Sequence, residues 1–181
     1  MRFYTLLTAV GLGLAGVSSA APPPASSPAA QVAALPISTM LTAALDAYNI
    51  GRFADARVKF RALADADSAI AETMLGTMYA RGQGVRADPA TASIYYFRAA
   101  QRGYAPAQLA LARAFATGGG VAVDRDEASI WARRARQRGD PRVAAAAANF
   151  IAGLDANRTT GERASLDARV TAWRPWPDGR E

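Results

Sequence analysis

Residues 75–103 read LGTMYARGQGVRADPATASIYYFRAAQRG, and residues 111–139 read LARAFATGGGVAVDRDEASIWARRARQRG. Aligned without a gap at a spacing of 36 residues, 14 of the 29 pairs are identical. A fixed period of this length is typical of stacked supersecondary units, none of which can bury its apolar face alone. The sequence therefore predicts an architecture built from repeated units.

Each copy contains residues that typically end one helix and begin another, which indicates a pair of helices. Gly82 and Gly118 are expected to end the first helix by adopting the left-handed conformation that satisfies its last carbonyl groups. The second helix is expected to start at Asp88, an N-cap followed by proline, and at Asp124, which should form a capping box with Glu127. Each unit is thus predicted to be helix, glycine-rich turn, helix.

The two copies share apolar and glycine residues at fixed positions. In the first copy these are Leu75, Gly76, Met78, Tyr79, Gly82, Gly84, Val85, Asp88, Ala92, Tyr95, Tyr96, Ala99, Ala100 and Gly103. In the second copy they are Ala105, Ala107, Leu111, Phe115, Gly118, Gly120, Val121, Asp124, Ala128, Trp131, Ala135 and Gly139. This pattern resembles the Sel1-like repeat, a relative of the tetratricopeptide repeat, over about residues 68–143. The second copy departs from the motif at Ala112, Ala132 and Arg136.

The resemblance implies an all-α fold, a short right-handed α-solenoid of stacked helix pairs with a C-terminal capping helix. The repeat domain is predicted to cover residues 38–177, with units at about 39–67, 68–103 and 104–139 and terminal helices within 141–174. The first unit keeps the period but lacks the glycine loop. Thr159 and Glu162 predict a capping box at the start of the last helix. Trp173 and Trp176 are expected to pack back onto that helix, and an aromatic ligand platform is the alternative.

The N-terminal residues differ from the rest of the chain. Residues 1–20 have the positive end, uncharged apolar run and small terminal residues of a secretory signal, with cleavage expected at Ala20 or Ala21. The apolar run is short for an uncleaved membrane anchor, so no stable membrane span is expected after cleavage. Residues 21–37, rich in Pro, Ala and Ser, are predicted to be a flexible linker. We therefore expect a periplasmic or secreted protein, without the cysteine that a lipoprotein would need.

Composition argues against catalysis. The chain has no histidine and no cysteine, so the usual acid–base and thiolate arrangements are absent. Its clustered carboxylates fall at predicted helix ends, where capping and the helix dipole account for them: Asp65, Asp67, Asp124, Asp126 and Glu127. We expect no enzymatic activity, no cofactor and no metal, and an enzyme of unrecognised type is the last alternative. The net charge of +6 is carried almost wholly by arginine, and we expect no nucleic-acid partner.

Recognition of a partner is the remaining class of function. The resemblance implies that the first helices of successive pairs line a concave face that holds a protein or peptide. Positions on those helices that the motif leaves free are expected to face outward and contact the partner: Glu72, Thr77, Gln108, Arg113 and Asn149. An ordinary solvated face would explain their polarity equally well. The sequence thus predicts an exported, noncatalytic protein-interaction module with a regulatory or assembly role in the bacterial envelope.

A basic run on a second helix gives an alternative surface. It consists of Arg133, Arg134, Arg136, Arg138 and Arg142. Such a run would suit cell-wall glycan or another anionic envelope polymer, and solvated surface is the simpler interpretation because net charge alone identifies no partner.

Overall fold

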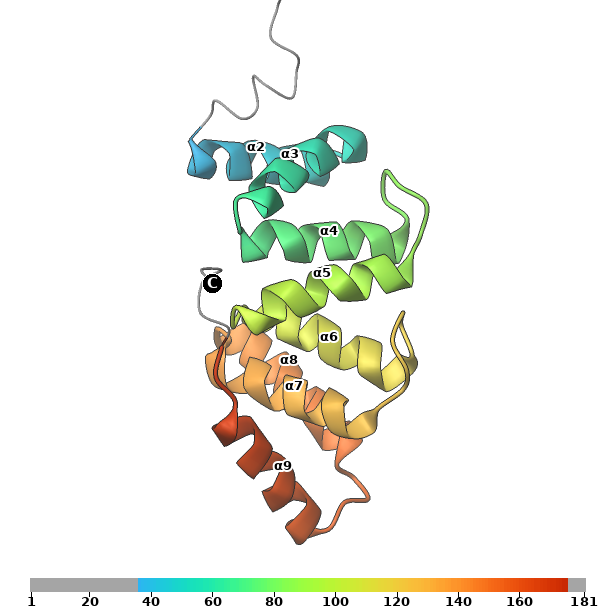
Figure 1. The fold of residues 1–181 in the computed structure, drawn as a ribbon, viewed down its shortest axis with the longest axis vertical. Coiled ribbons are helices and arrows are strands. Elements are labelled where there is room, and N and C mark those ends of the chain that lie inside the picture. The colour runs from blue at the N-terminus through green and yellow to red at the C-terminus, as the bar shows by residue number, and fades with distance from the viewer. Residues whose placement is uncertain (1–35, 176–181) are drawn as a thin grey trace, which may run out of the picture.

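The computed structural model describes residues 36–175, which form a stack of eight helices without a strand (Figure 1). The helices are α2 (Ile37–Asn49), α3 (Phe53–Asp65), α4 (Ala69–Arg81), α5 (Pro89–Gln101), α6 (Ala105–Thr117), α7 (Arg125–Arg138), α8 (Pro141–Leu154) and α9 (Thr160–Ala172). From α2 to α8 each helix packs against the next along the chain, whereas α9 packs against α7. The predicted all-α solenoid is confirmed. The expected signal, nearly all of the expected linker, and Trp176 lie outside the described residues.

The glycine-rich turns form as the sequence predicts. Gly82 and Gly118 end α4 and α6 with φ values of 68° and 76°, in the left-handed region. Gly120, with φ 83°, approaches the N-terminus of α5 so closely that a Cβ atom there would lie 2.0 Å from the carbonyl oxygen of Pro89. The turn after α6 is therefore fixed against the preceding helix pair, and only glycine fits this position.

Most of the predicted N-caps are present. Asp88 accepts hydrogen bonds from the backbone N–H groups of Ala90 and Thr91, and Thr159 forms its capping box with Glu162. The capping box expected at Asp124 is only half formed. Asp124 caps α7, but the carboxylate of Glu127 is instead 2.6 Å from Arg169 Nη2 on α9. An ion pair to the capping helix thus replaces the local hydrogen bond.

The apolar core runs along the stack between successive helices. Its N-terminal part holds Phe60, Leu63, Leu75 and Met78, all fully buried between α3 and α4. The middle part joins α5, α6 and α7, and at the far end Leu166 and Val170 of α9 cover Ile130 of α7. The last helix therefore covers the apolar end of the stack, as a solenoid requires. Within residues 36–175, no helix has both the length and the apolar character needed to cross a membrane.

Candidate functional site

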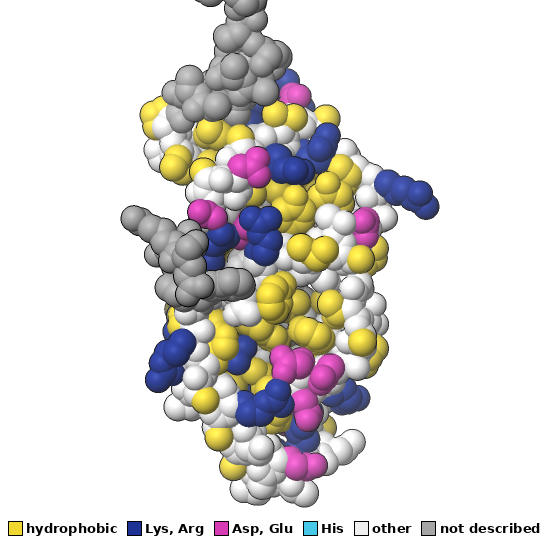
Figure 2. Space-filling view, in the orientation of Figure 1, with side chains coloured by type: hydrophobic (Ala, Val, Ile, Leu, Met, Phe, Trp, Pro, Cys, Tyr) yellow, Lys and Arg dark blue, Asp and Glu magenta, His cyan; other side chains and the backbone are white. Residues whose placement is uncertain are grey.

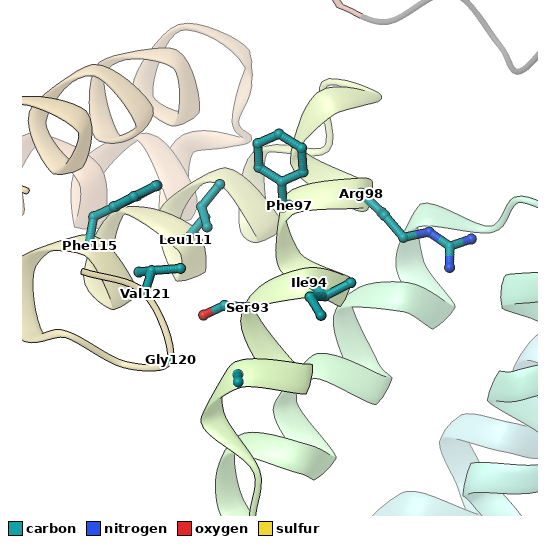
Figure 3. A pocket seen from close by; sticks show the side chains of 9 residues that line it. Ser93, Ile94, Phe97, Arg98, Leu111, Phe115, Gly120 and Val121 are labelled. Carbon is teal, nitrogen blue, oxygen red and sulfur yellow. The ribbon is translucent and has the colours of Figure 1, made fainter. Parts of the chain in front are cut away.

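An apolar pocket opens between α5, α6 and the turn that follows α6 (Figure 3). It encloses about 280 Å³. Its lining comes mainly from Ser93, Ile94 and Phe97 of α5, Leu111 and Phe115 of α6, and Val121 of the turn. Ile94 is 61% exposed and Phe97 is 40% exposed, and apolar side chains gather on this face of the molecule (Figure 2). Large apolar side chains left in water beside a concavity are typical of interaction sites.

The pocket depends on the approach of the turn to α5. Ser93 Oγ donates a hydrogen bond to the carbonyl oxygen of Gly119 at 2.6 Å, which holds the turn in place. Arg98 contributes to the lining, but its guanidinium points away from the apolar side chains (Figure 3). Its Nε atom lies 2.9 Å from Glu72 Oε1, an ion pair that lacks hydrogen-bond geometry. The interior therefore offers apolar contact and no acid–base group.

Two of the five residues predicted to face a partner are buried instead. Glu72 and Gln108 are both fully buried, so the expectation that they face outward is wrong. They lie 36 residues apart and therefore occupy the same position in successive helix pairs, and both contact α5. Glu72 is paired with Arg98 and Arg102, and Gln108 Nε2 donates to the carbonyl oxygen of Ala100 at 3.1 Å.

The other three predicted residues share a different position in the repeat. Thr77, Arg113 and Asn149 are also spaced by 36 residues, on α4, α6 and α8. Arg113 and Asn149 are exposed, while Thr77 is partly buried with its Oγ1 3.3 Å from the hydroxyl of Tyr96. Their contact with a partner stays a prediction.

The predicted basic run is divided between surface and interior. Arg136, Arg138 and Arg142 are exposed, but Arg133 and Arg134 are buried, so the run is not one continuous surface. The chain after α8 covers these two arginines, because Asp155, at the end of α8, and Trp173, after α9, lie against them.

Arg133 is held by three hydrogen bonds. Its Nη2 donates to Asp155 at 2.5 Å, its Nε to Asp167 at 2.8 Å and its Nη1 to Ser129 at 2.7 Å. Burial disfavours its charge, but the hydrogen bonds to the two carboxylates prevail and raise the pKa of Arg133 above its ordinary value. Arg133 is thus a structural cation.

Comparison with known proteins identifies the repeat family of the helices in the middle of the stack. The family model of the Sel1 repeat matches residues 69–104 and 105–140. These residues are two Sel1 repeats. The first consists of α4 and α5, and the second of α6 and α7. Proteins with this fold are typically protein–protein interaction modules and are generally noncatalytic.

Solved structures show the same fold. The chain is 20% identical to a Sel1 repeat protein from Oxalobacter formigenes, with a TM-score of 0.58, covering 72% of this chain and 54% of that one. It is 18% identical to a protective antigen present in uropathogenic Escherichia coli strains, described as displaying an SLR fold, with a TM-score of 0.52, covering 81% of this chain and 35% of that one. The chain thus spans about half the length of the Oxalobacter formigenes protein and about a third of the length of the Escherichia coli antigen. No curated protein matches it.

The structure joins two features that the sequence offered separately, Arg134 of the basic run and Trp173 of the possible aromatic platform, at Trp131 of α7. Arg134 Cζ lies 4.5 Å from the ring centroid of Trp131 and 4.6 Å from that of Trp173, and the two rings meet edge to face at 6.0 Å. Burial lowers the pKa of Arg134 to about 10. Trp173 therefore packs mainly on α7, not on the last helix, and Trp173 Nε1 also donates to Gln101 of α5. Aligning the Sel1 repeats at 36 residues could have revealed the site, since Arg134 corresponds to Arg98.

The clustered carboxylates cap helices or pair with arginines in the described chain. Asp126 is paired with Arg158, and Glu127 with Arg169. Among residues 36–175, no three His, Cys, Asp or Glu side chains are placed to share a metal ion. The Sel1 repeats offer surfaces for contact: the apolar pocket, the exposed first-helix residues and the arginines of α7.

Proposed function

We propose that this protein is an exported, noncatalytic module that binds another protein or a peptide. The observation that carries the proposal is the apolar pocket of α5, α6 and the following turn, because Ile94 and Phe97 leave apolar surface exposed at its mouth. Burying that surface in a partner would contribute roughly 25 cal/mol per Å². Because the pocket is already formed in the free protein, a partner that binds it as it stands avoids part of the entropic cost of ordering the site.

The first helices offer a second contact surface to the same partner. Thr77, Arg113 and Asn149 repeat at one position per helix pair and differ in chemistry, as a specific surface requires. Export rests on the signal-like residues 1–20, which lead us to propose that the module acts in the bacterial envelope, in assembly or regulation.

An anionic envelope polymer is the second candidate partner. Arg136, Arg138 and Arg142 are exposed, and none of them forms an ion pair within the described part of the chain. Unpaired surface cations in a row would attract cell-wall glycan or a similar polyanion, and such binding would weaken steeply with salt.

Photo-crosslinking tests the choice between these partners. A photoreactive amino acid is placed at Ile94, at Arg113 or, as a control on another exposed apolar position, at Val58 of α3. The protein from Ala21 onward is irradiated in envelope extract, and the products are identified by mass spectrometry. We expect one protein to be crosslinked from Ile94 or Arg113 and not from Val58. Equal yields at all three positions, or recovery of glycan alone, would overturn the proposal.

Export is tested separately on the full chain. The protein is expressed in a Gram-negative host, the cells are fractionated, and the mass of its N-terminal peptide is determined. We expect a periplasmic or secreted product that begins at Ala21 or Pro22. An intact N-terminus in the cytoplasm would contradict export while leaving the binding proposal in place.

A further inference from the structure

The two Sel1 repeats treat equivalent arginines differently. In the first repeat, Glu72 is paired with both Arg98 and Arg102, and Arg102 is also paired with Asp67. One period later, the positions of the two arginines are occupied by Arg134 and Arg138. The positions of the two carboxylates are occupied by Gln108 and Gly103. Both cations thus recur one period later, and neither carboxylate does.

The absence of these carboxylates leaves unmatched polar atoms in the second repeat. Gln108 Oε1 and Arg134 Nε are both buried without a hydrogen-bond partner. Arg134 is only 9% exposed, and within residues 36–175 neither Arg134 nor Arg138 forms an ion pair. A buried cation without an ion-pair partner is costly, and contact with aromatic faces together with the attraction of Glu127 offsets only part of that cost. The site is therefore suited to an added anion.

The aromatic rings hold the two arginines in place. Trp131 and Trp173 form a corner around the Arg134 guanidinium, and Arg138 Cζ lies 5.2 Å from the Trp173 ring. A Cβ atom placed on Gly103 would be 2.9 Å from Arg138 Nη1, at the position where the first repeat has Asp67. The Arg138 guanidinium thus lies directly against Gly103, where no side chain supplies the carboxylate that Asp67 supplies to Arg102.

The apolar pocket lies next to this corner. Phe97 at the pocket contacts Trp131 edge to face, with ring centroids 6.2 Å apart, and Trp131 in turn contacts Arg134. An extended chain advances about 3.3–3.6 Å per residue, so two or three residues bridge the pocket and the arginine corner. One short peptide segment can therefore reach both features.

We propose that the surface formed by the apolar pocket, Arg134 and Arg138 binds an acidic peptide segment of a partner protein. An Asp or Glu of the partner supplies the negative charge that Glu72 and Asp67 supply in the first repeat. A bulky apolar side chain, two or three residues away, enters the pocket. This inference rests on the proposed function and names the chemistry of its partner. Charge complementarity selects the occupant, because the pocket is apolar and the cations beside it are unmatched.

Fluorescence anisotropy of a defined peptide tests the proposal. The probe is a labelled peptide with one phenylalanine followed two residues later by two glutamates, and its control carries glutamines instead. With the protein from Ala21 onward, we expect the glutamate peptide to bind on the order of tenfold or more tightly than the control. The double variant Arg134→Met with Arg138→Met should remove that preference. Arg136→Met with Arg142→Met, which removes the same charge from exposed positions, should retain it.

Gln108→Glu provides a test that does not depend on damaging the site. It restores the carboxylate of the first repeat with a side chain of nearly the same shape, at the cost of the hydrogen bond from Gln108 Nε2 to the carbonyl oxygen of Ala100. We expect Gln108→Glu to pair with Arg134 internally and to weaken binding of the glutamate peptide on the order of tenfold. Unfolding curves of each variant establish that the helices remain intact.

Several outcomes would overturn the inference. Equal affinity for the two peptides, or unchanged affinity for the glutamate peptide in Gln108→Glu, would mean that no carboxylate of the partner binds beside Arg134 and Arg138. Equal losses in both double arginine variants would indicate diffuse attraction of a polyanion. Binding that appears only in a chain truncated after Pro175 would identify the chain's own C-terminal residues as the occupant. A partner crosslinked from Ile94 that tolerates Arg134→Met with Arg138→Met would refute the acidic segment and leave the proposed function standing.

Discussion

Arg133 Nη2 on α7 lies 2.5 Å from Asp155 Oδ2 at the end of α8, and both side chains are buried. Asp155 Oδ1 also accepts a hydrogen bond from Ser129, and Arg133 extends to Asp167 of α9. The group therefore joins α7, α8 and α9. Ser93, one period before Ser129, makes the corresponding bond to Gly119, so both serines fix the turn of the following unit.

Removing the carboxylate of this pair should loosen the capping helix. Asp155→Ala leaves a buried guanidinium with only Asp167, which is largely exposed, as its counter-charge. Breaking a buried pair in this way costs about 3–5 kcal/mol of unfolding free energy. Denaturant unfolding measures the loss, and Asp65→Ala, which removes an exposed pair with Arg61, serves as the control at about 1 kcal/mol or less. Similar small losses in both variants would contradict a structural role for Arg133.

Glu72 should matter for stability and not for binding. Glu72→Gln keeps the shape of the side chain but removes the negative charge between Arg98 and Arg102. Since Arg98 is half exposed and can be rehydrated, we expect a loss of about 1–3 kcal/mol, smaller than that of Asp155→Ala. The unfolding free energy and the crosslinking yield from Ile94 are measured together.

The matched change for that experiment is Arg113→Gln, on the exposed face of α6. It should leave the unfolding free energy within about 0.5 kcal/mol of the parent protein. If Glu72→Gln reduced crosslinking to the partner while the unfolding free energy stayed unchanged, Glu72 would contact the partner as the sequence predicted.

The period of 36 residues predicted the helices, turns and most caps because those depend on residues close together in the chain. Which free position of a first helix faces outward depends on its rotation within the stack. That rotation buries Glu72 and Gln108 together and exposes Arg113 and Asn149 together. The sequence motif does not contain this rotation. Aligning the copies at the 36-residue period would have separated the position of Glu72 and Gln108 from that of Arg113 and Asn149. Only the packing of the helices shows which of these two positions is buried.

The pocket, and the corner that Trp131 and Trp173 form around Arg134, could not be predicted from the sequence. Phe97 and Trp131 come from different repeats, and Trp173 joins them from a residue 42 positions after Trp131. Their contact depends on how α5, α7 and the chain after α9 pack. The arginine run looked uniform in sequence, yet Asp155 and Trp173 bury only its first two members. Long-range packing, and not local pattern, therefore decides the candidate sites.

Gly120 provides a direct test of the close approach beneath the pocket. In Gly120→Ala the new methyl group would meet the carbonyl of Pro89 at a residue with positive φ. The clash and the left-handed backbone together should cost at least about 2 kcal/mol and should open the pocket. Gly153→Ala in α8 meets nothing within 4 Å and should stabilise the protein by roughly 0.5–1 kcal/mol.

Thermal unfolding of the two glycine variants and amide exchange at Val121 measure these effects. We expect faster exchange at Val121 in Gly120→Ala alone. Unchanged exchange there would mean that the turn shifts without loosening, and the pocket would not depend on the glycine.

The capping box of α9 should make stability depend on pH in one direction. Hydrogen bonds from the backbone and side chain of Thr159 hold the pKa of Glu162 below its ordinary value of 4.5. Because the folded-state pKa is lowered, the ionised carboxylate stabilises the protein above pH 4.5, and this contribution is lost as the pH falls through the folded-state value. The parent protein should therefore be more stable than Glu162→Gln at pH 7, with the difference narrowing in acid.

Denaturant unfolding of both proteins at pH 7 and near pH 3 measures that difference. Asn157→Ala, at an exposed residue just before the box, is the control, because it carries no titrating group and its effect should be the same at both pH values. A difference between the parent and Glu162→Gln that stays constant from pH 7 to pH 3 would mean that the charge of Glu162 does not contribute. In that case the hydroxyl of Thr159, which accepts from the backbone N–H of Glu162, would account for the cap.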